Sequence, residues 1–280
     1  MKKWYFSIVA VALLLVGLIL ASPSFSQPAS ASSFDQAYKD YTLTVEKYRR
    51  THDEYILTRS QYIKFQSLTS QNNAKQATIN MLEARDDVVI RYLGSLKARI
   101  EEISGIQDAT KEGLFFRLDE EINWFTDHRN KLGSAGSLED LVADSNQARE
   151  RFEEDDPLIY ESLSNISAGK VNKFRNRLND IFSRIRDKVN TIKEEDRSEY
   201  QFSTRKIEII DRWVFEIESR ITRSEEKQQE ADELISELGS GKGGSTRYNK
   251  ILERLGESQQ FLKEASLFIR EIVREIKTAE

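Results

Sequence analysis

Hydrophobic residues recur three or four positions apart through most of the chain after residue 33, and this spacing keeps side chains on one side of a helix. No segment alternates hydrophobic and polar residues with the period of two that is typical of a strand. The pattern therefore predicts an all-α fold, an elongated antiparallel helical bundle or set of coiled-coil hairpins of about seven helices. The last segment shows it most fully, with Tyr248, Ile251, Leu255, Ser258, Leu262, Ala265, Ile269, Ile272 and Ile276.

Glycine, proline and capping residues divide the pattern. Ser137 with Asp140 favours a helix start, Asp156 can cap a helix whose first residue is Pro157, and Ser198 with Gln201 forms a capping box. A second seam near the middle of the chain carries Phe174, Leu178, Ile181, Ile185, Val189 and Ile192. The predicted helices cover about residues 34–70, 72–103, 115–132, 138–152, 157–193, 198–238 and 245–276.

The loop 133–136, Gly-Ser-Ala-Gly, is the predicted domain boundary. It would separate an N-terminal helical bundle, 34–133, from a C-terminal one, 137–280, although long helices that merge the two into one body are the alternative. The C-terminal part contains a glycine-rich segment, 239–244, which is interpreted as a flexible loop.

The first 26 residues have the order of parts of an export signal. Lys2 and Lys3 precede the apolar run 4–20, and small polar residues follow it. Cleavage after Ser26 would leave a polar linker, 27–33. The alternative is an uncleaved anchor, because the run is longer than the usual apolar core of a signal peptide yet shorter than the ~20 residues of a membrane span. We expect an exported protein that is periplasmic, extracellular or anchored to the outer face of the cytoplasmic membrane, with membrane contact only through residues 4–20 if they are retained.

Charge and cysteine content narrow the function. Without Lys2 and Lys3 the chain carries 40 basic and 47 acidic residues, a mildly acidic balance that argues against nucleic acid as the partner. The chain of 280 residues has no cysteine, so its stability does not depend on disulfides and it has no lipid-anchored cysteine.

The residues that carry chemistry do not form a known site. His52 and His128 are the only histidines, and a bundle metal site would need Glu three residues before each, where Arg49 and Phe125 stand. Lys242 precedes a glycine rather than the hydroxyl residue of a phosphate loop. We therefore predict no enzyme, no metal and no cofactor. The adjacent acidic pairs are interpreted as capping or solvated charge, namely Asp86-Asp87, Glu120-Glu121 and Asp155-Asp156.

Tyrosines recur along the first helix, where other segments use Leu and Ile; this tyrosine stripe consists of Tyr38, Tyr41, Tyr48, Tyr55 and Tyr62. Tyrosine suits a half-wet surface, because its ring is apolar and its hydroxyl is polar. One interpretation is a helix at the edge of a bundle, packed on its rings with its hydroxyls in water. The other is a face that binds a partner helix, a wall polymer or a second copy of the chain.

The opening helix, with YKDY at 38–41 and YRR at 48–50, and the following YIKFQSLTSQ at 62–71 resemble exported all-helical proteins of uncultured bacteria, themselves uncharacterised. The resemblance covers the N-terminal third of the exported chain. It implies a bacterial exported protein and transfers no active site.

These observations predict a non-catalytic secreted or envelope-associated helical protein that mediates protein–protein interaction or scaffolding, through an unknown protein partner or self-association. The alternative is a module that binds a cell-wall polymer or glycan through the tyrosine stripe. An extracytoplasmic enzyme is the third hypothesis.

Overall fold

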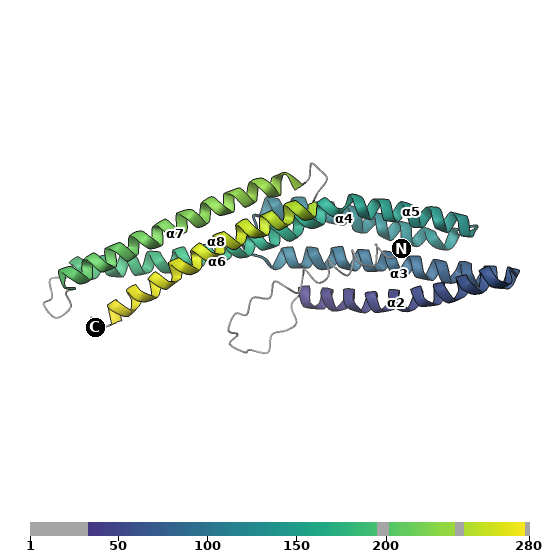
Figure 1. The fold of residues 1–280 in the computed structure, drawn as a ribbon, viewed down its shortest axis with the longest axis horizontal. Coiled ribbons are helices and arrows are strands. Elements are labelled where there is room, and N and C mark those ends of the chain that lie inside the picture. The colour runs from purple at the N-terminus through teal and green to yellow at the C-terminus, as the bar shows by residue number, and fades with distance from the viewer. Residues whose placement is uncertain (1–32, 195–201, 239–243, 278–280) are drawn as a thin grey trace. The chain divides into compact units, whose positions relative to one another are not determined.

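A computed structural model describes residues 33–194, 202–238 and 244–277, and Ser33–Glu280 form one compact unit (Figure 1). These described residues form helices and include no strand, so the predicted all-α fold is confirmed. None of the described helices is long and apolar enough to cross a membrane. The elements are α2 (Ser33–Phe65), α3 (Leu68–Glu102), α4 (Asp108–Lys131), the 3-10 turn η1 (Leu132–Ser134), α5 (Leu138–Glu154), α6 (Asp156–Glu194), α7 (Thr204–Ser236) and α8 (Gly244–Lys277).

Helices α2 and α3 pack against each other and are joined by a turn of two residues, Gln66 and Ser67. Gln66 has a φ of 49°, the left-handed conformation that commonly ends a helix. The Ser67 hydroxyl accepts a hydrogen bond from the Ser70 backbone N–H at 3.2 Å and so caps α3. The sequence placed this break near residue 71; the structure places it earlier because Ser67, rather than a later residue, supplies the cap.

The long helix α3 also contacts α4, η1, α5 and α6. Its buried side chains meet those of η1 and α5 in one hydrophobic cluster, and tyrosines of α2 pack against that cluster. The predicted start of α5 is confirmed, since the Asp140 N–H donates to the Ser137 hydroxyl at 3.1 Å and Asp140 Oδ2 accepts from the Ser137 N–H at 2.9 Å. The cluster consists of Ile79, Met81, Leu82, Leu132 and Leu141.

Helices α6, α7 and α8 share a second core. All nine predicted seam positions of α8 are buried, so that prediction is confirmed. In α6 the buried line passes through Leu178, Phe182 and Val189, whereas Ile181 is exposed. The predicted seam is wrong at Ile181. Ile181 and Phe182 are adjacent and point to different sides of α6, and Phe182 is on the side that faces the core.

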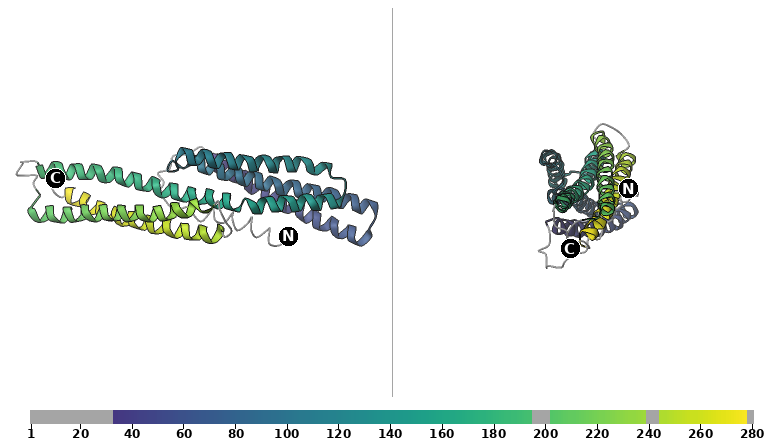
Figure 2. Two further views of the ribbon diagram at one scale, coloured as in Figure 1. Left: turned by 90° about the horizontal axis from the view of Figure 1, so that it is seen from above. Right: turned by 90° about the vertical axis from the view of Figure 1, so that its left-hand side faces the viewer.

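Helix α6 extends from the helices near the N-terminus to those near the C-terminus (Figure 2). Small residues line its first half where it crosses the α3–α4 turn. A Cβ atom on Gly105 would lie only 2.0 Å from the carbonyl oxygen of Gly169 on α6, so glycine is required at this crossing. Asn172 Nδ2 donates to the Gly105 carbonyl at 3.2 Å and holds the turn on α6.

Several predictions fall on residues outside the described ranges. These are the export segment, the linker before residue 33, the capping box of Ser198 with Gln201, and most of the glycine-rich loop. Helix α7 begins at Thr204, and the Ser203 hydroxyl accepts from the Lys206 N–H at 3.3 Å. The division at residues 133–136 stays a prediction, and helices on its two sides contact each other, since α3 packs on α5 and α6.

Candidate functional site

The predicted tyrosine stripe lies along the contact between α2 and α3. Tyr41 is buried, with its ring centroid 5.6 Å from that of Tyr92 on α3, and burial raises the pKa of Tyr41 to about 12. Tyr48 and Tyr55 pack against the hydrophobic cluster of α3, η1 and α5. The first and last tyrosines of the stripe are half-buried. The rings therefore attach α2 to its neighbours, and the use of the stripe for binding a partner stays a prediction.

The two histidines have different surroundings. His52 is half-buried within the stripe, with its ring centroid 5.9 Å from that of Tyr48 and 6.1 Å from that of Tyr55. His128, on α4, is buried and stacks on Trp124 at 5.1 Å. Only His128 takes part in a buried polar cluster.

Each ring nitrogen of His128 faces an acceptor. Nδ1 lies 2.6 Å from Asp86 Oδ2, and Nε2 lies 3.2 Å from the backbone carbonyl oxygen of Asp144. Asp86 Oδ1 also accepts from the Arg85 guanidinium at 3.3 Å, so the Asp86 carboxylate lies between a guanidinium and the His128 ring. The carboxylate and the Asp144 carbonyl hold the two edges of the imidazole ring in place. Since Nε2 faces a carbonyl rather than a hydroxyl, the pair is not arranged to activate a serine or threonine.

A second buried ionic group joins α4 to α5. Arg151 donates to both oxygens of Glu121, at 2.7 and 2.5 Å, and its guanidinium lies 5.7 Å from the centre of the Trp124 ring. Asp155 is buried beside this pair. Burial, and then the charge of Glu121, raise the pKa of Asp155 to about 8. The three residues thus form a compact carboxylate and guanidinium cluster at the start of α6.

The interpretation of the acidic pairs as capping or solvated charge is wrong for one member of each pair. Asp86, Glu121 and Asp155 are buried, whereas their neighbours are partly or fully exposed. Adjacent residues do point apart on a helix, but one of the two directions leads into the protein. His128, which faces Asp86, lies 42 residues from it, and Arg151 lies 30 residues from Glu121, so local sequence gives no sign of these two contacts.

A cavity of about 440 Å³ lies between the α3–α4 turn, α6 and the end of α7. Arg117 donates to both carboxylate oxygens of Glu161 on its wall, at 2.8 and 2.6 Å. Asp232 enters from α7; burial raises its pKa, and the charge of Arg175 opposes that rise. Arg117 and Glu161 neutralise each other, so this pair leaves no net charge on the cavity wall.

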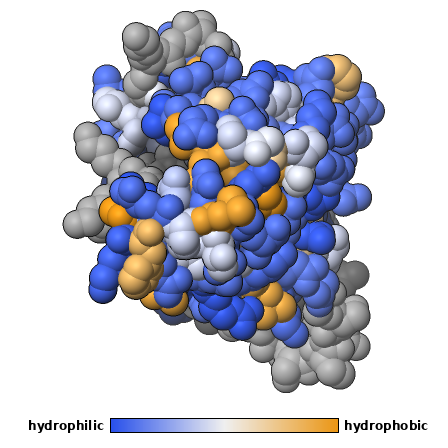
Figure 3. All heavy atoms as spheres, turned by 90° about the vertical axis from the view of Figure 1, so that its right-hand side faces the viewer, coloured by the Kyte–Doolittle hydropathy of each residue, from blue (hydrophilic) through white to orange (hydrophobic). Residues whose placement is uncertain are grey.

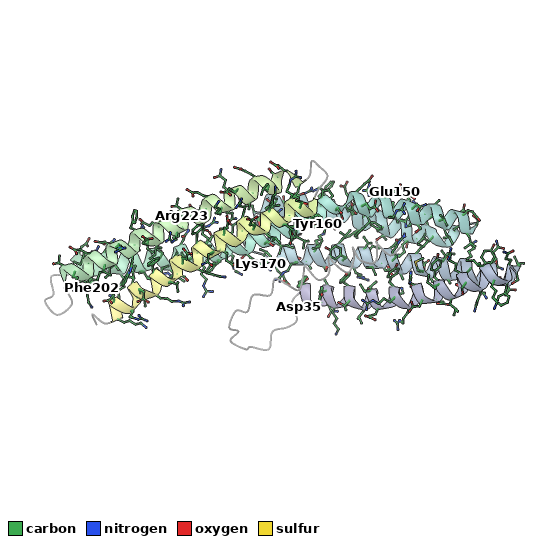
Figure 4. All side chains as sticks on the ribbon, in the orientation of Figure 1. Asp35, Glu150, Tyr160, Lys170, Phe202 and Arg223 are labelled. Atoms are coloured by element: carbon green, nitrogen blue, oxygen red, sulfur yellow. The ribbon has the colours of Figure 1, made fainter. Side chains whose placement is uncertain are left out.

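Lys170 lies on α6, the helix that carries Glu161 (Figure 4), and its side chain is half-buried. Burial lowers its pKa to about 8, and the positive charge of Arg99 contributes further. Such a lysine is partly neutral near pH 8. It does not line the cavity, so the two features do not form one site.

The strongest candidate for contact with another molecule is the turn between α2 and α3. We call its exposed hydrophobic residues the hairpin-end surface. They lie within thirteen positions of the chain. Phe65 is the last residue of α2 and Leu68 the first residue of α3, so the two stand on opposite sides of the short turn. The residues are Ile56, Leu57, Ile63, Phe65 and Leu68.

Exposure at this surface is large. Leu68 is 73% exposed and Phe65 is 63% exposed, although large apolar side chains gain free energy by burial. Figure 3 views the described helices from the side on which the α2–α3 turn lies in Figure 1, and hydrophobic atoms gather there among hydrophilic ones. Several large apolar side chains left exposed near one turn are a candidate interaction site.

The sequence held two signs of this surface that periodicity alone did not reveal. Its members lie off the seam that the tyrosine stripe follows, so they had no predicted neighbour. They also all lie within residues 55–82. This run contains no aspartate or glutamate, although the chain has 47 of these acidic residues. Neither sign fixes exposure, which depends on the helices that cover each side.

Among the described residues, no group of three or more histidine or acidic side chains comes together in a way that would hold a metal ion. Comparison of the sequence and structure with family models, curated proteins and solved structures gave no match. Any function must therefore be argued from the contacts and surfaces above.

Proposed function

We propose that this chain is a non-catalytic helical scaffold, exported and then secreted or associated with the envelope, that works by contact through the hairpin-end surface. In this proposal its helices form an elongated antiparallel bundle of about seven helices, and the tyrosine stripe holds α2 in place. The observation that carries the proposal is the exposure of large hydrophobic side chains on both sides of a short, capped turn. Binding of a wall polymer by the stripe stays a second prediction.

The rigidity of the turn supports this role. The Gln66 N–H donates to the Tyr62 carbonyl at 2.8 Å and ends α2, while Ser67 caps α3. Phe65 and Leu68 are thus presented on helix ends rather than on a long loop. A surface held in this way loses little conformational entropy when it binds, which favours affinity.

Thiol accessibility tests the contact. Because the chain has no cysteine, Phe65→Cys introduces a single reactive thiol. We expect its modification rate in the full-length protein, expressed in a bacterial host, to fall several-fold when the purified protein is mixed with the host's envelope fraction. Phe116→Cys is the matched control, since Phe116 on α4 is 66% exposed. Equal rates with and without envelope at both positions would contradict the proposal.

Intact mass and cell fractionation test the export part. A mass that begins at Gln27 in the soluble exported fraction indicates cleavage after Ser26. A full-length mass in the membrane fraction indicates an anchored scaffold. Recovery of the full-length chain from the cytosol would contradict export.

A further inference from the structure

The hairpin-end surface combines exposed hydrophobic side chains with positive charge. Residues 55–82 contain Arg59, Lys64 and Lys75 and no acidic residue, although the whole chain carries a net charge of −5. The local charge is therefore opposite in sign to that of the protein. Such a contrast selects an anionic partner.

The cations lie beside the apolar groups. Lys64 Nζ is 5.3 Å from the centre of the Phe65 ring, so the ammonium and the exposed ring point to the same region. Lysine can keep its charge at a polar boundary while its methylene stem and the neighbouring ring enter an apolar layer. This pairing of cation and apolar group is typical of side chains at a bilayer interface.

Other charged groups approach from the start of α5. Lys75 Nζ donates to the Gly136 carbonyl at 2.9 Å, which brings this loop next to α3. Glu139 and Asp140 follow this loop in the chain, in the first turn of α5. The Asp140 carboxylate accepts from the Ser137 N–H and so caps α5. Phe65 and Leu68 lie at the turn itself, where the nearest charges along the chain are the basic Arg59 and Lys64.

We propose that the hairpin-end surface docks on an anionic lipid bilayer, with Ile63, Phe65 and Leu68 entering the boundary between headgroups and acyl chains. The inference rests on the proposed function, because it names the partner of the same surface. Two copies of the surface carry like charge and repel each other, so a second copy is the poorer occupant. A bilayer satisfies both the apolar and the cationic groups at once.

A fluorophore at the turn tests docking in the full-length chain. An environment-sensitive dye on Phe65→Cys should become brighter and shift to the blue with vesicles of phosphatidylcholine and phosphatidylglycerol, and much less with phosphatidylcholine alone. Phe116→Cys and Phe215→Cys are matched controls, since these phenylalanines are 66% and 68% exposed on α4 and α7. The readout is local, so binding by residues 4–20 does not imitate it.

Variants of Lys64 and Leu68 measure how much the positive charge and the apolar side chain each contribute to vesicle binding. With the dye still on Phe65→Cys, Lys64→Glu changes the local charge by two units and should weaken partitioning about thirtyfold, whereas Lys64→Arg should preserve it. Leu68→Asp should weaken partitioning about tenfold or more without loss of helical circular dichroism. Added salt should weaken binding of the parent protein.

The outcomes separate the two proposals. If the dye at position 65 responds to neither vesicle while the envelope fraction still protects the thiol there, the lipid inference is overturned and the scaffold proposal stands with a protein partner. A dye response that depends on protein concentration without lipid indicates self-association and also overturns the inference. If neither vesicles nor the envelope fraction affect position 65, both proposals fail.

Discussion

The helices α3, α4 and α5 bury charged groups, whereas α6, α7 and α8 bury a mainly aliphatic seam. In the first region Asp86 is paired with His128 and Glu121 with Arg151. In the second, the buried polar contacts include a pair of hydroxyls, Ser224 and Ser258, 2.8 Å apart. Both regions are helical and well packed, yet their polar contacts differ in what is lost when one partner is removed. A buried charge left alone costs far more than a missing hydroxyl.

The largest expected effect is at the buried carboxylate of the first region. Asp86→Asn removes the negative charge that faces both His128 and Arg85, and should lower the free energy of unfolding by about 3–5 kcal/mol. Urea unfolding followed by circular dichroism measures it. The neighbouring Asp87→Asn is the control; its ion pairs with Lys47 and Arg129 are partly exposed, so a loss below about 1 kcal/mol is expected. Equal losses for the two variants would mean that the buried carboxylate of Asp86 contributes no more to stability than the partly exposed carboxylate of Asp87.

The junction of the two regions should be the next most sensitive place. Gly105→Ala forces a methyl group against the Gly169 carbonyl and should cost about 2–3 kcal/mol. Gly113→Ala on α4 meets no atom within 4 Å and should be neutral or stabilise by up to about 1 kcal/mol. Thermal unfolding of both variants checks this. A Gly105→Ala protein as stable as the parent would show that the turn is free to move away from α6.

The third prediction concerns pH in the first region. The folded-state pKa of Asp155, about 8, lies above its ordinary value of 3.8, so the stability that neutral Asp155 supplies is present in acid and is lost as pH rises toward 8. Asp155→Asn, which cannot ionise, should match the parent near pH 4. At pH 8 it should be more stable by at least about 1 kcal/mol.

Unfolding curves at a series of pH values give this difference directly. Glu150→Gln serves as the control because Glu150 is exposed on α5. A constant difference between Asp155→Asn and the parent from pH 4 to pH 8 would contradict the raised pKa.

The smallest effect is expected in the second region. Changing both Ser224 and Ser258 to Ala removes donor and acceptor together, although the Ser258 hydroxyl also donates to the Ser224 carbonyl at 2.8 Å. The net change should stay within about 1 kcal/mol, because apolar methyl groups suit the surrounding seam. Denaturant unfolding of the double variant measures it. A loss similar to that of Asp86→Asn would remove the contrast between the regions.

Much of the helical framework could be predicted from the sequence. The seam of α8 and the capping box of α5 are set by residues a few positions apart, and a regular helix places such residues together whatever the rest of the chain does. The predicted break between α2 and α3 was a few residues late. Two serines near it, Ser67 and Ser70, both favour caps, and sequence pattern does not choose between them.

The candidate site was less predictable. The stripe was visible as a pattern, but its burial against α3 depends on Tyr92, a residue more than fifty positions from Tyr41. Periodicity does not predict the hairpin-end surface, because it identifies seams and gives no weight to hydrophobic residues that lie off them. The sequence shows that residues 55–82 are basic and contain no acidic residue. It does not show that these residues flank a tight turn, which the structure places at Gln66.

The sequence by itself determined that the described part of the chain is helical, where α5, α6 and α8 begin and end to within two residues, and which side of α8 is buried, because these depend on contacts within one or two helical turns. Only the tertiary structure decided that Asp86 rather than Asp87 is buried, that Phe182 replaces Ile181 in the core, and that Phe65 and Leu68 are left uncovered. The physical reason is the same in each case. Burial of a given side chain depends on which distant helix packs over it, and the local pattern does not specify that neighbour.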